Sequence, residues 1–367
     1  MRLRSLDVFR GLTMAGMVLV NNPGDWATVY APLLHAEWHG WTPTDLIFPW
    51  FLFIMGSAMA QTEPSQSSMA TVLRRGAVLV GLGLFMAGFP YFNPARWRIP
   101  GVLFRLGVCY VAAASMWRLV AMPGQPRTTL RRCAAGAAAC LLVYWALLAL
   151  VPPPGGVAGD LTAEGNLGAW LDRAIFGSHL WKARWDPEGL LSSLPAVGTT
   201  LMGVVAGLWL RASRPACGAP VLVWAGAVAV IAGLLWGAVL PINKSLWTSS
   251  YALFTGGTAT LALGVLHLRL DDGRASPLLM RITEPLVALG RNALLLFVLS
   301  GLVAKSLMLL TVGTGAATVS WQQWIYTTAF APIAAPKVAS LLHALAMLAL
   351  LSLLLAWLHR RRWYWSV

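Results

Sequence analysis

Ten apolar stretches, of which the first two are short, follow one another along the chain and are separated by polar segments. A helix that crosses a membrane needs about 20 mostly apolar residues, so the pattern predicts ten transmembrane helices. The polar residues between them are too few to cover a soluble core. The fold class predicted is therefore all-α, a polytopic transmembrane helix bundle. The predicted spans are Val8–Asn21, Asp45–Ala60, Leu73–Pro90, Val102–Val120, Cys133–Val151, Leu190–Leu210, Val221–Leu240, Tyr251–Leu268, Leu286–Leu310 and Val338–Leu358.

Composition supports a protein embedded in the lipid bilayer. Of 367 residues, 58% are hydrophobic and 11% are charged, whereas a soluble domain carries about 25% charged residues. The net charge of +14 does not indicate a nucleic-acid partner, because the basic residues occur in small groups between apolar runs. The four cysteines have no CxxC spacing, which gives no disulfide or zinc signal.

The arginine distribution predicts the orientation of the helices. Cytoplasmic segments of membrane proteins are enriched in Lys and Arg. Arginine groups recur in every second connection, as at Arg74 and Arg75, and again at Arg360–Arg362. Ten spans with both termini cytoplasmic agree with this pattern. The long connection Pro152–Gly189 is then an extracytoplasmic loop within a single domain covering residues 1–367. We expect the N-terminal apolar run to be a retained span, because no small-residue cleavage site follows it.

The segment between the first two spans concentrates titratable side chains. His35 is the leading catalytic candidate, because imidazole serves readily as a general base near neutral pH and can also accept an acyl group. The ordinary alternative is a wet loop whose tryptophans form an interfacial aromatic belt. His39 lies four residues further on, but HAEWHG is not an HExxH motif, so no metal site is predicted.

Two polar residues of the neighbouring spans complete this candidate site. Asp45 either caps the helix that it begins or orients the imidazole of His35, as the acid does in a catalytic triad. Asn21 ends the first span, where it either caps carbonyl groups or donates a hydrogen bond to a developing oxyanion. Both functional alternatives require these side chains to meet near His35.

Basic residues inside apolar stretches indicate an anionic ligand. Arg105 is costly in lipid and needs a partner or a wet cavity, and Arg291 with Asn292 raises the same question near the predicted inner face. We predict that these three residues bind the phosphates of a cofactor. The polar segment 241–251 offers many donors for a sugar, although an ordinary loop with a serine-rich cap is the alternative. Its predicted substrate-binding residues are Asn243, Lys244, Trp247 and Ser250.

Several sequence blocks in order resemble one known family. They include SLDVFRGLTMAGMVLVNNPGDW, HAEWHGWTPTDLIFPWFLFIMG, RIPGVLFRLGVCY, LPINKSLWTSSYALFTGG and LGRNALLLFVLSG. Together they resemble the heparan-α-glucosaminide N-acetyltransferase family in its bacterial form, over nearly the whole chain. The family's lysosomal members acetylate a terminal glucosamine amine and use cytosolic acetyl-CoA. His35 matches the family's active-site histidine and Asn21 matches an asparagine implicated beside it, whereas asparagine stands at the position of His39.

The resemblance implies acetyl-CoA as co-substrate, a homodimer and location in the bacterial inner membrane. The predicted function is transfer of an acetyl group from cytosolic acetyl-CoA to an amino or hydroxyl group of an extracytoplasmic sugar or glycoconjugate. Bacteria do not generally make heparan sulfate, so the acceptor does not follow from the family. A transporter or flippase is the alternative, with Arg105, Arg291 and Lys305 along an anion path.

Overall fold

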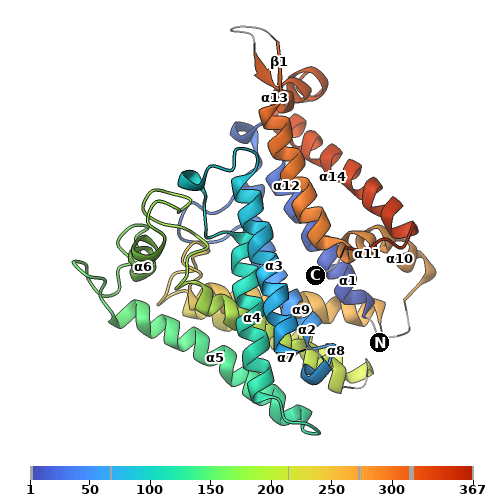
Figure 1. Cartoon of the computed structure of the whole chain (residues 1–367). Coiled ribbons are helices and arrows are strands. Elements are labelled where there is room, and N and C mark those ends of the chain that lie inside the picture. Colours follow the sequence, from blue (N-terminus) through green and yellow to red (C-terminus); the bar gives the residue numbers. More distant parts are fainter. Residues whose placement is uncertain are drawn as a thin grey trace. The chain divides into compact units, whose positions relative to one another are not determined.

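The computed structural model describes residues 3–66, 68–213, 215–271, 273, 275–313 and 318–365. The chain divides into two compact units that are each discontinuous in sequence. Unit 1 comprises residues 1–6, 36–41 and 48–275, and unit 2 comprises residues 7–35, 42–47 and 276–367. Both units are built almost entirely from helices (Figure 1), which confirms the predicted all-α class. The expectation of one domain over residues 1–367 stays a prediction.

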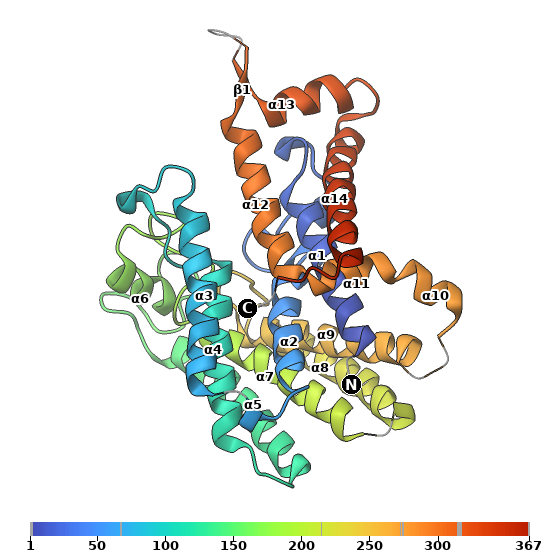
Figure 2. The same ribbon diagram turned by 45° about the vertical axis from the view of Figure 1, so that its right-hand side comes forward.

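Unit 1 contains the long helices of the middle of the chain. Helices α3 and α4 run side by side in both views, as do α8 and α9 (Figures 1 and 2). Helix α7 contacts α4, α5 and α9, so it lies at the centre of the unit. The helices are α2 (Ile47–Met59), α3 (Met69–Gly88), α4 (Val102–Val120), α5 (Pro126–Leu150), α6 (Leu167–Phe176), α7 (Ser193–Ala212), α8 (Pro215–Trp236) and α9 (Ser249–Leu270).

The core of unit 1 joins apolar side chains of α2, α4, α5, α7 and α9. Trp247 is 1% exposed and packs edge-on against Phe48 and Tyr251, with ring centroids 5.1 and 5.3 Å away. Helices α2 and α7 approach at Gly203, where an added Cβ would come within 2.0 Å of the carbonyl oxygen of Phe53. Only glycine permits this approach, so the packing of α2 on α7 depends on it.

Unit 2 combines the N-terminal helix with the C-terminal quarter of the chain. Helix α14 contacts α11 and α12, and a two-stranded antiparallel hairpin follows α12 (Figure 2). The amphipathic stretch after this hairpin forms α13 and a π-helical turn. The elements are α1 (Arg4–Asn21, with its first turn counted in unit 1), α10 (Pro277–Ile282), α11 (Glu284–Arg291), α12 (Ala293–Leu309), β1 (Thr311–Val312), β2 (Val319–Ser320), α13 (Trp321–Ile325), the π-helical turn Tyr326–Phe330 and α14 (Pro336–Arg360).

Each predicted span corresponds to helical structure, with one bend that the sequence did not reveal. Seven helices among the described residues are long and apolar enough to cross a membrane. The predicted span Leu286–Leu310 is broken at Asn292, and the segments Pro277–Arg291 and Ala293–Leu309 make an angle of 75°. Helix α2 is apolar but short, and α1 carries Asp7 and Arg10. The count of ten spans and the cytoplasmic termini therefore stay predictions.

Candidate functional site

His35 and Asp45 form a hydrogen-bonded pair within unit 2. The Nδ1 atom of His35 lies 2.7 Å from Oδ1 of Asp45. The His35 side chain is 51% exposed, whereas the Asp45 side chain is fully buried. The imidazole is therefore open to a substrate, while its carboxylate partner is shielded from water.

Local sequence explains how the pair forms. Thr42 begins a short 3-10 helix (Pro43–Leu46) that leads into α2, and its backbone N–H and hydroxyl donate to Oδ2 of Asp45 at 2.9 and 3.2 Å. The hydroxyls of Thr42 and Thr44 also donate to the carbonyl oxygens of Leu34 and Pro32. These bonds tie the segment before His35 to the start of α2. Asp45 thus caps this helix start and also contacts the imidazole, while its predicted catalytic role stays a prediction.

The pairing selects one tautomer of the imidazole. An ionised carboxylate only accepts hydrogen bonds, so Nδ1 of His35 carries the hydrogen that is donated to Asp45. The other nitrogen, Nε2, is then the one that can take a proton. The same relation between acid and histidine operates in a catalytic triad, where the acid orients the base and stabilises its protonated form.

Asn21 does not join this pair through a hydrogen bond. It is the last residue of α1 and is exposed. The neighbouring Asn22 is buried, and its amide donates to the carbonyl oxygen of Val18 at 2.7 Å. Asn22 therefore caps the C-terminal end of α1, and this cap does not require Asn21. The oxyanion role of Asn21 stays a prediction.

Arg291 and Asn292 hold the C-terminal segment in unit 2. The Asn292 side chain donates to the carbonyl oxygen of Trp363 at 3.2 Å and accepts from the N–H of Trp365 at 3.0 Å. Arg291 donates to the Tyr364 hydroxyl at 2.9 Å, and its guanidinium stacks 4.3 Å from the centroid of that ring. These contacts give both residues a structural role, and their predicted role in binding a cofactor stays untested.

Arg105 lies fully buried in the first turn of α4 in unit 1. Its Nη2 atom donates to the carbonyl oxygen of Gly189 at 3.0 Å and to the hydroxyl of Ser192, and its guanidinium stacks 5.0 Å from the Trp247 ring centroid. Its Nε and Nη1 atoms form no hydrogen bond within the described chain. Gly189 ends the connection that is predicted to be extracytoplasmic. The predicted topology would place Arg105 at the outer end of α4, and its predicted role in binding a cofactor stays a prediction.

The segment predicted to bind substrate is largely buried. Asn243, Trp247 and Ser250 are at most 1% exposed, and Lys244 is partly exposed. The Ser250 hydroxyl donates to the carbonyl oxygen of Leu240 at 2.6 Å, and Oδ1 of Asn243 accepts from the N–H of Leu246 at 2.8 Å. Their polar atoms thus stabilise the turn before α9. Nδ2 of Asn243 also lies 3.3 Å from Nδ1 of His39.

A buried ionic cluster anchors the connection 152–189. Arg98 donates to both carboxylate oxygens of Asp186, at 2.8 and 2.6 Å, and also binds Glu188. Burial lowers the pKa of Arg98, but the two carboxylates outweigh that effect and raise it above its ordinary value. For Asp172 in α6, burial raises the pKa to about 6, although the Leu190 N–H donates to its Oδ1 atom. Sequence reading missed this cluster because its members lie about 90 residues apart.

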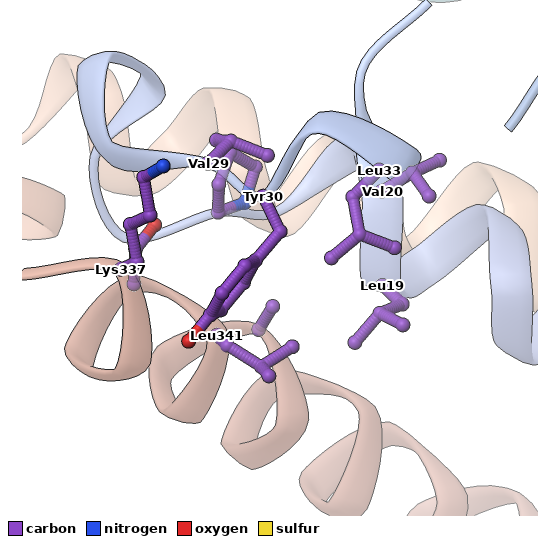
Figure 3. A pocket seen from close by; sticks show the side chains of 10 residues that line it. Leu19, Val20, Val29, Tyr30, Leu33, Lys337 and Leu341 are labelled. Carbon is purple, nitrogen blue, oxygen red and sulfur yellow. The ribbon is translucent and has the colours of Figure 1, made fainter. Parts of the chain in front are cut away.

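Three cavities differ in what they can hold. Figure 3 shows a hollow in unit 2 where Tyr30 reaches toward α14 beside Leu341. Its volume of about 10 Å³ suffices for one water molecule. On unit 1, a pocket of about 500 Å³ is lined by Glu37, Trp38, His39, Leu161, Thr162, Ala163 and Trp185. This second cavity is therefore a candidate for an organic ligand, and so is the third, which is larger.

The third cavity has a volume of about 930 Å³ and lies in unit 1, at the ends of α4 and α7 and the start of α5. Trp117, Arg118 and Arg211 are among the residues that line it. The indole N–H of Trp117 is buried and forms no hydrogen bond within the described residues. The sequence signal for this site was the arginine groups themselves, which were used only to orient the helices.

Residues 2–146 match the family model described as heparan-alpha-glucosaminide N-acetyltransferase, catalytic. The heparan-alpha-glucosaminide N-acetyltransferase of Homo sapiens is 31% identical, over 74% of this chain and 49% of that protein. The Mus musculus protein of the same name is 28% identical over the same shares. The chain thus spans about half the length of the curated relatives that it matches.

The matched range contains Asn21, His35 and Asp45, which are the three residues predicted to carry the chemistry. It also contains Arg105 but ends before the segment 241–251. The resemblance inferred from the sequence blocks is therefore confirmed: the chain is related to the heparan-alpha-glucosaminide N-acetyltransferases, and its residues 2–146 match the model of their catalytic region.

Proposed function

We propose that the protein is a membrane-embedded acyltransferase of a bacterial inner membrane. It moves an acetyl group from cytosolic acetyl-CoA to an amino or hydroxyl group of an extracytoplasmic sugar or glycoconjugate. The observation that carries the proposal is the pair of a half-exposed His35 and a buried Asp45 at 2.7 Å. The relatives' name, which specifies N-acetyl transfer, supports the same reaction class.

The pair supplies general-base catalysis. Nε2 of His35 takes a proton from the acceptor amine or hydroxyl as its nitrogen or oxygen bonds to the thioester carbonyl carbon. The carbon–sulfur bond then breaks, and the thiolate of CoA takes the proton back from the imidazolium. Asp45 stabilises the imidazolium and does not itself transfer a proton. A route through an acetylated His35 needs the same residues, with Nε2 as the nucleophile.

The phosphates of acetyl-CoA fit the cavity that contains Arg118 and Arg211. Its volume of about 930 Å³ lies within the range of ligand pockets, about 300–1,000 Å³. Arginine binds phosphate oxygens through several N–H groups at once. Arg118 donates to the carbonyl oxygen of Pro64, and Arg211 donates to those of Ala60 and Thr62 and pairs with Glu63, which lines the same cavity. Both guanidinium groups are thus held in place. Both arginines belong to segments that the charge pattern predicts to be cytoplasmic.

The test is turnover of purified protein with labelled acetyl-CoA and glucosamine. A general base contributes roughly 10²–10⁴-fold to rate, so His35→Ala should lower kcat by at least that lower bound while acetyl-CoA binding persists. Asp45→Asn should lower kcat by less. An asparagine can still accept from Thr42, but its amide would face Nδ1 and favour the tautomer that has its hydrogen on Nε2.

His39→Asn is the matched control, because asparagine stands there in the lysosomal relatives. It should retain acetyl transfer. An inactive His39→Asn beside a fully active His35→Ala would show that the wrong histidine was chosen. Transport of a labelled glycan into vesicles, with no acetylated product from the wild-type protein, would instead support the transporter alternative.

A further inference from the structure

The C-terminal end of α14 meets the turn between α10 and α11 in unit 2. Nε2 of His359 lies 3.2 Å from Oε1 of Glu284, and the imidazole packs edge-on against Tyr364, with ring centroids 5.7 Å apart. Both views show this end of α14 beside α11 (Figures 1 and 2). Arg281 precedes Glu284 by three residues, and Arg360 directly follows His359. Two segments that lie 75 residues apart in sequence therefore contribute to one surface.

This surface is strongly basic. It carries four exposed arginines, Arg281, Arg360, Arg361 and Arg362. None of their guanidinium groups has a hydrogen bond or ion pair with another described residue. In sequence, the segments 276–292 and 357–365 contain a single acid, Glu284, and its carboxylate lies next to His359. The four positive charges are therefore largely uncompensated and open to an anionic partner. We call these four arginines the basic surface.

Large apolar side chains surround the basic surface. Leu278 and Ile282 lie four residues apart on the same side of α10 and are 68% and 60% exposed. Trp357, Trp363 and Trp365 are exposed as well. Tryptophan is enriched where a membrane meets water, because its ring is apolar and its N–H is polar. Exposed apolar and basic side chains on one surface are typical of a segment that lies in the membrane interface.

The course of α14 indicates which partner this surface meets. Its residues Pro336–Arg360 are long and apolar enough to cross a membrane, and the apolar run ends at Leu358, two residues before Arg360. A spanning helix changes from apolar to charged where it leaves the hydrocarbon region. The arginines that follow then lie at the depth of the lipid headgroups. Their charge is complementary to anionic headgroups and not to zwitterionic ones.

We propose that the basic surface is a binding site for anionic phospholipid. The guanidinium groups bind the phosphate oxygens of the headgroup, and the side chains of Leu278, Ile282 and Trp363 lie among the acyl chains. The backbone of residues 363 and 365 also binds the Asn292 side chain at the bend between α11 and α12. The bound lipid therefore holds the C-terminal segment on this bend. The proposal is independent of the proposed acyl transfer.

Native mass spectrometry of the full-length protein in detergent tests the lipid preference. Phosphatidylglycerol and phosphatidylcholine are titrated separately, since they differ in headgroup charge. One arginine near an anionic headgroup contributes about fivefold to binding. If two arginines contact one headgroup, phosphatidylglycerol should bind about 25-fold more tightly than phosphatidylcholine. The triple variant Arg360→Gln, Arg361→Gln, Arg362→Gln should reduce this preference to about fivefold or less. Arg281→Gln alone should reduce it about fivefold.

Two matched triple variants separate the site from net charge. Lysine at positions 360–362 keeps the charge and should keep most of the preference. Arg127→Gln, Arg131→Gln, Arg132→Gln removes three exposed arginines of α5 in unit 1 and should leave the preference unchanged. The proposal is overturned if the two lipids bind alike, or if the α5 variant loses as much preference as the variant at residues 360–362. Displacement of phosphatidylglycerol by inorganic phosphate or CoA at constant ionic strength would instead identify a soluble phosphate as the ligand and refute the lipid site.

Discussion

Asp172 provides a test of how the connection 152–189 is packed. Its side chain is 3% exposed, and its Oδ1 atom accepts from the N–H of Leu190 at 2.8 Å, just before α7. Burial raises the pKa of this carboxyl to about 6, from an ordinary value of 3.8, and the hydrogen bond from Leu190 and the charge of Arg105 offset only part of that effect. The folded protein therefore holds a proton that the unfolded chain has already lost.

This difference sets the sign and size of a stability effect. Between the two pKa values the folded state binds more protons, so the contribution of Asp172 to stability is complete below pH 4 and is lost as the pH rises through 6. A difference of two pKa units corresponds to about 3 kcal/mol near pH 8 and to about 1 kcal/mol near pH 4.5. Asp172→Asn keeps the acceptor for Leu190 but cannot ionise. It should therefore be more stable than the wild type above pH 6.

The assay is thermal unfolding in detergent across the pH range. For a chain of this size, about 3 kcal/mol corresponds to roughly 4 °C in Tm. Asp172→Asn should gain about that much near pH 8 and only about 1 °C near pH 4.5. Glu164→Gln is the matched control, because the Glu164 side chain in the same connection is 56% exposed. It should show no such dependence. A Tm difference that is constant with pH, or a variant that is less stable near pH 8, would refute the packing of Asp172 described above.

Two further predictions concern the charged clusters. Arg98→Ala leaves two buried carboxylates without their partner and should cost about 3–5 kcal/mol of stability. Arg184→Ala removes one partner of an exposed ion pair and should cost about 0–1 kcal/mol. Denaturant unfolding measures both losses, and equal losses would contradict the buried cluster. Acetyl-CoA should raise Tm, since it binds the folded state, and Arg118→Ala or Arg211→Ala should reduce that rise while Arg105→Ala leaves it unchanged. If only Arg105→Ala reduced the rise in Tm caused by acetyl-CoA, the phosphates would instead bind at the end of α4 that holds Arg105.

The helices could be predicted from the sequence because a single apolar run in lipid satisfies its own backbone hydrogen bonds only as a helix. Val102–Val120 has the same bounds in prediction and structure. The bend at Asn292 could not be predicted, since the two segments together are long and apolar enough for one span. At the bend, the Asn292 side chain binds the backbone of residues 363 and 365. A contact over about 70 residues leaves no local pattern.

The candidate site could likewise be predicted only in part from the sequence. His35 and Asp45 were predicted to meet, and ten residues of separation with a capping signal at Thr42 sufficed for that prediction. For Asn243 and Ser250, residue type indicated polarity but not burial, and their hydroxyl and amide groups bond to the backbone of their own turn. The pocket of Glu37 and Trp185 joins segments almost 150 residues apart. Its existence follows only from tertiary structure.

The double use of Asp45 has a consequence for how activity depends on temperature. One carboxylate accepts from Thr42, at the start of the 3-10 helix Pro43–Leu46 that leads into α2, and from the imidazole of His35. Helix ends fray at lower free-energy cost than the whole protein unfolds. Each fraying event in this first turn turns the carboxylate away from the imidazole. The proposed enzyme therefore loses the orientation of its general base when this turn melts locally. We expect its activity to fall at a lower temperature than that of global unfolding.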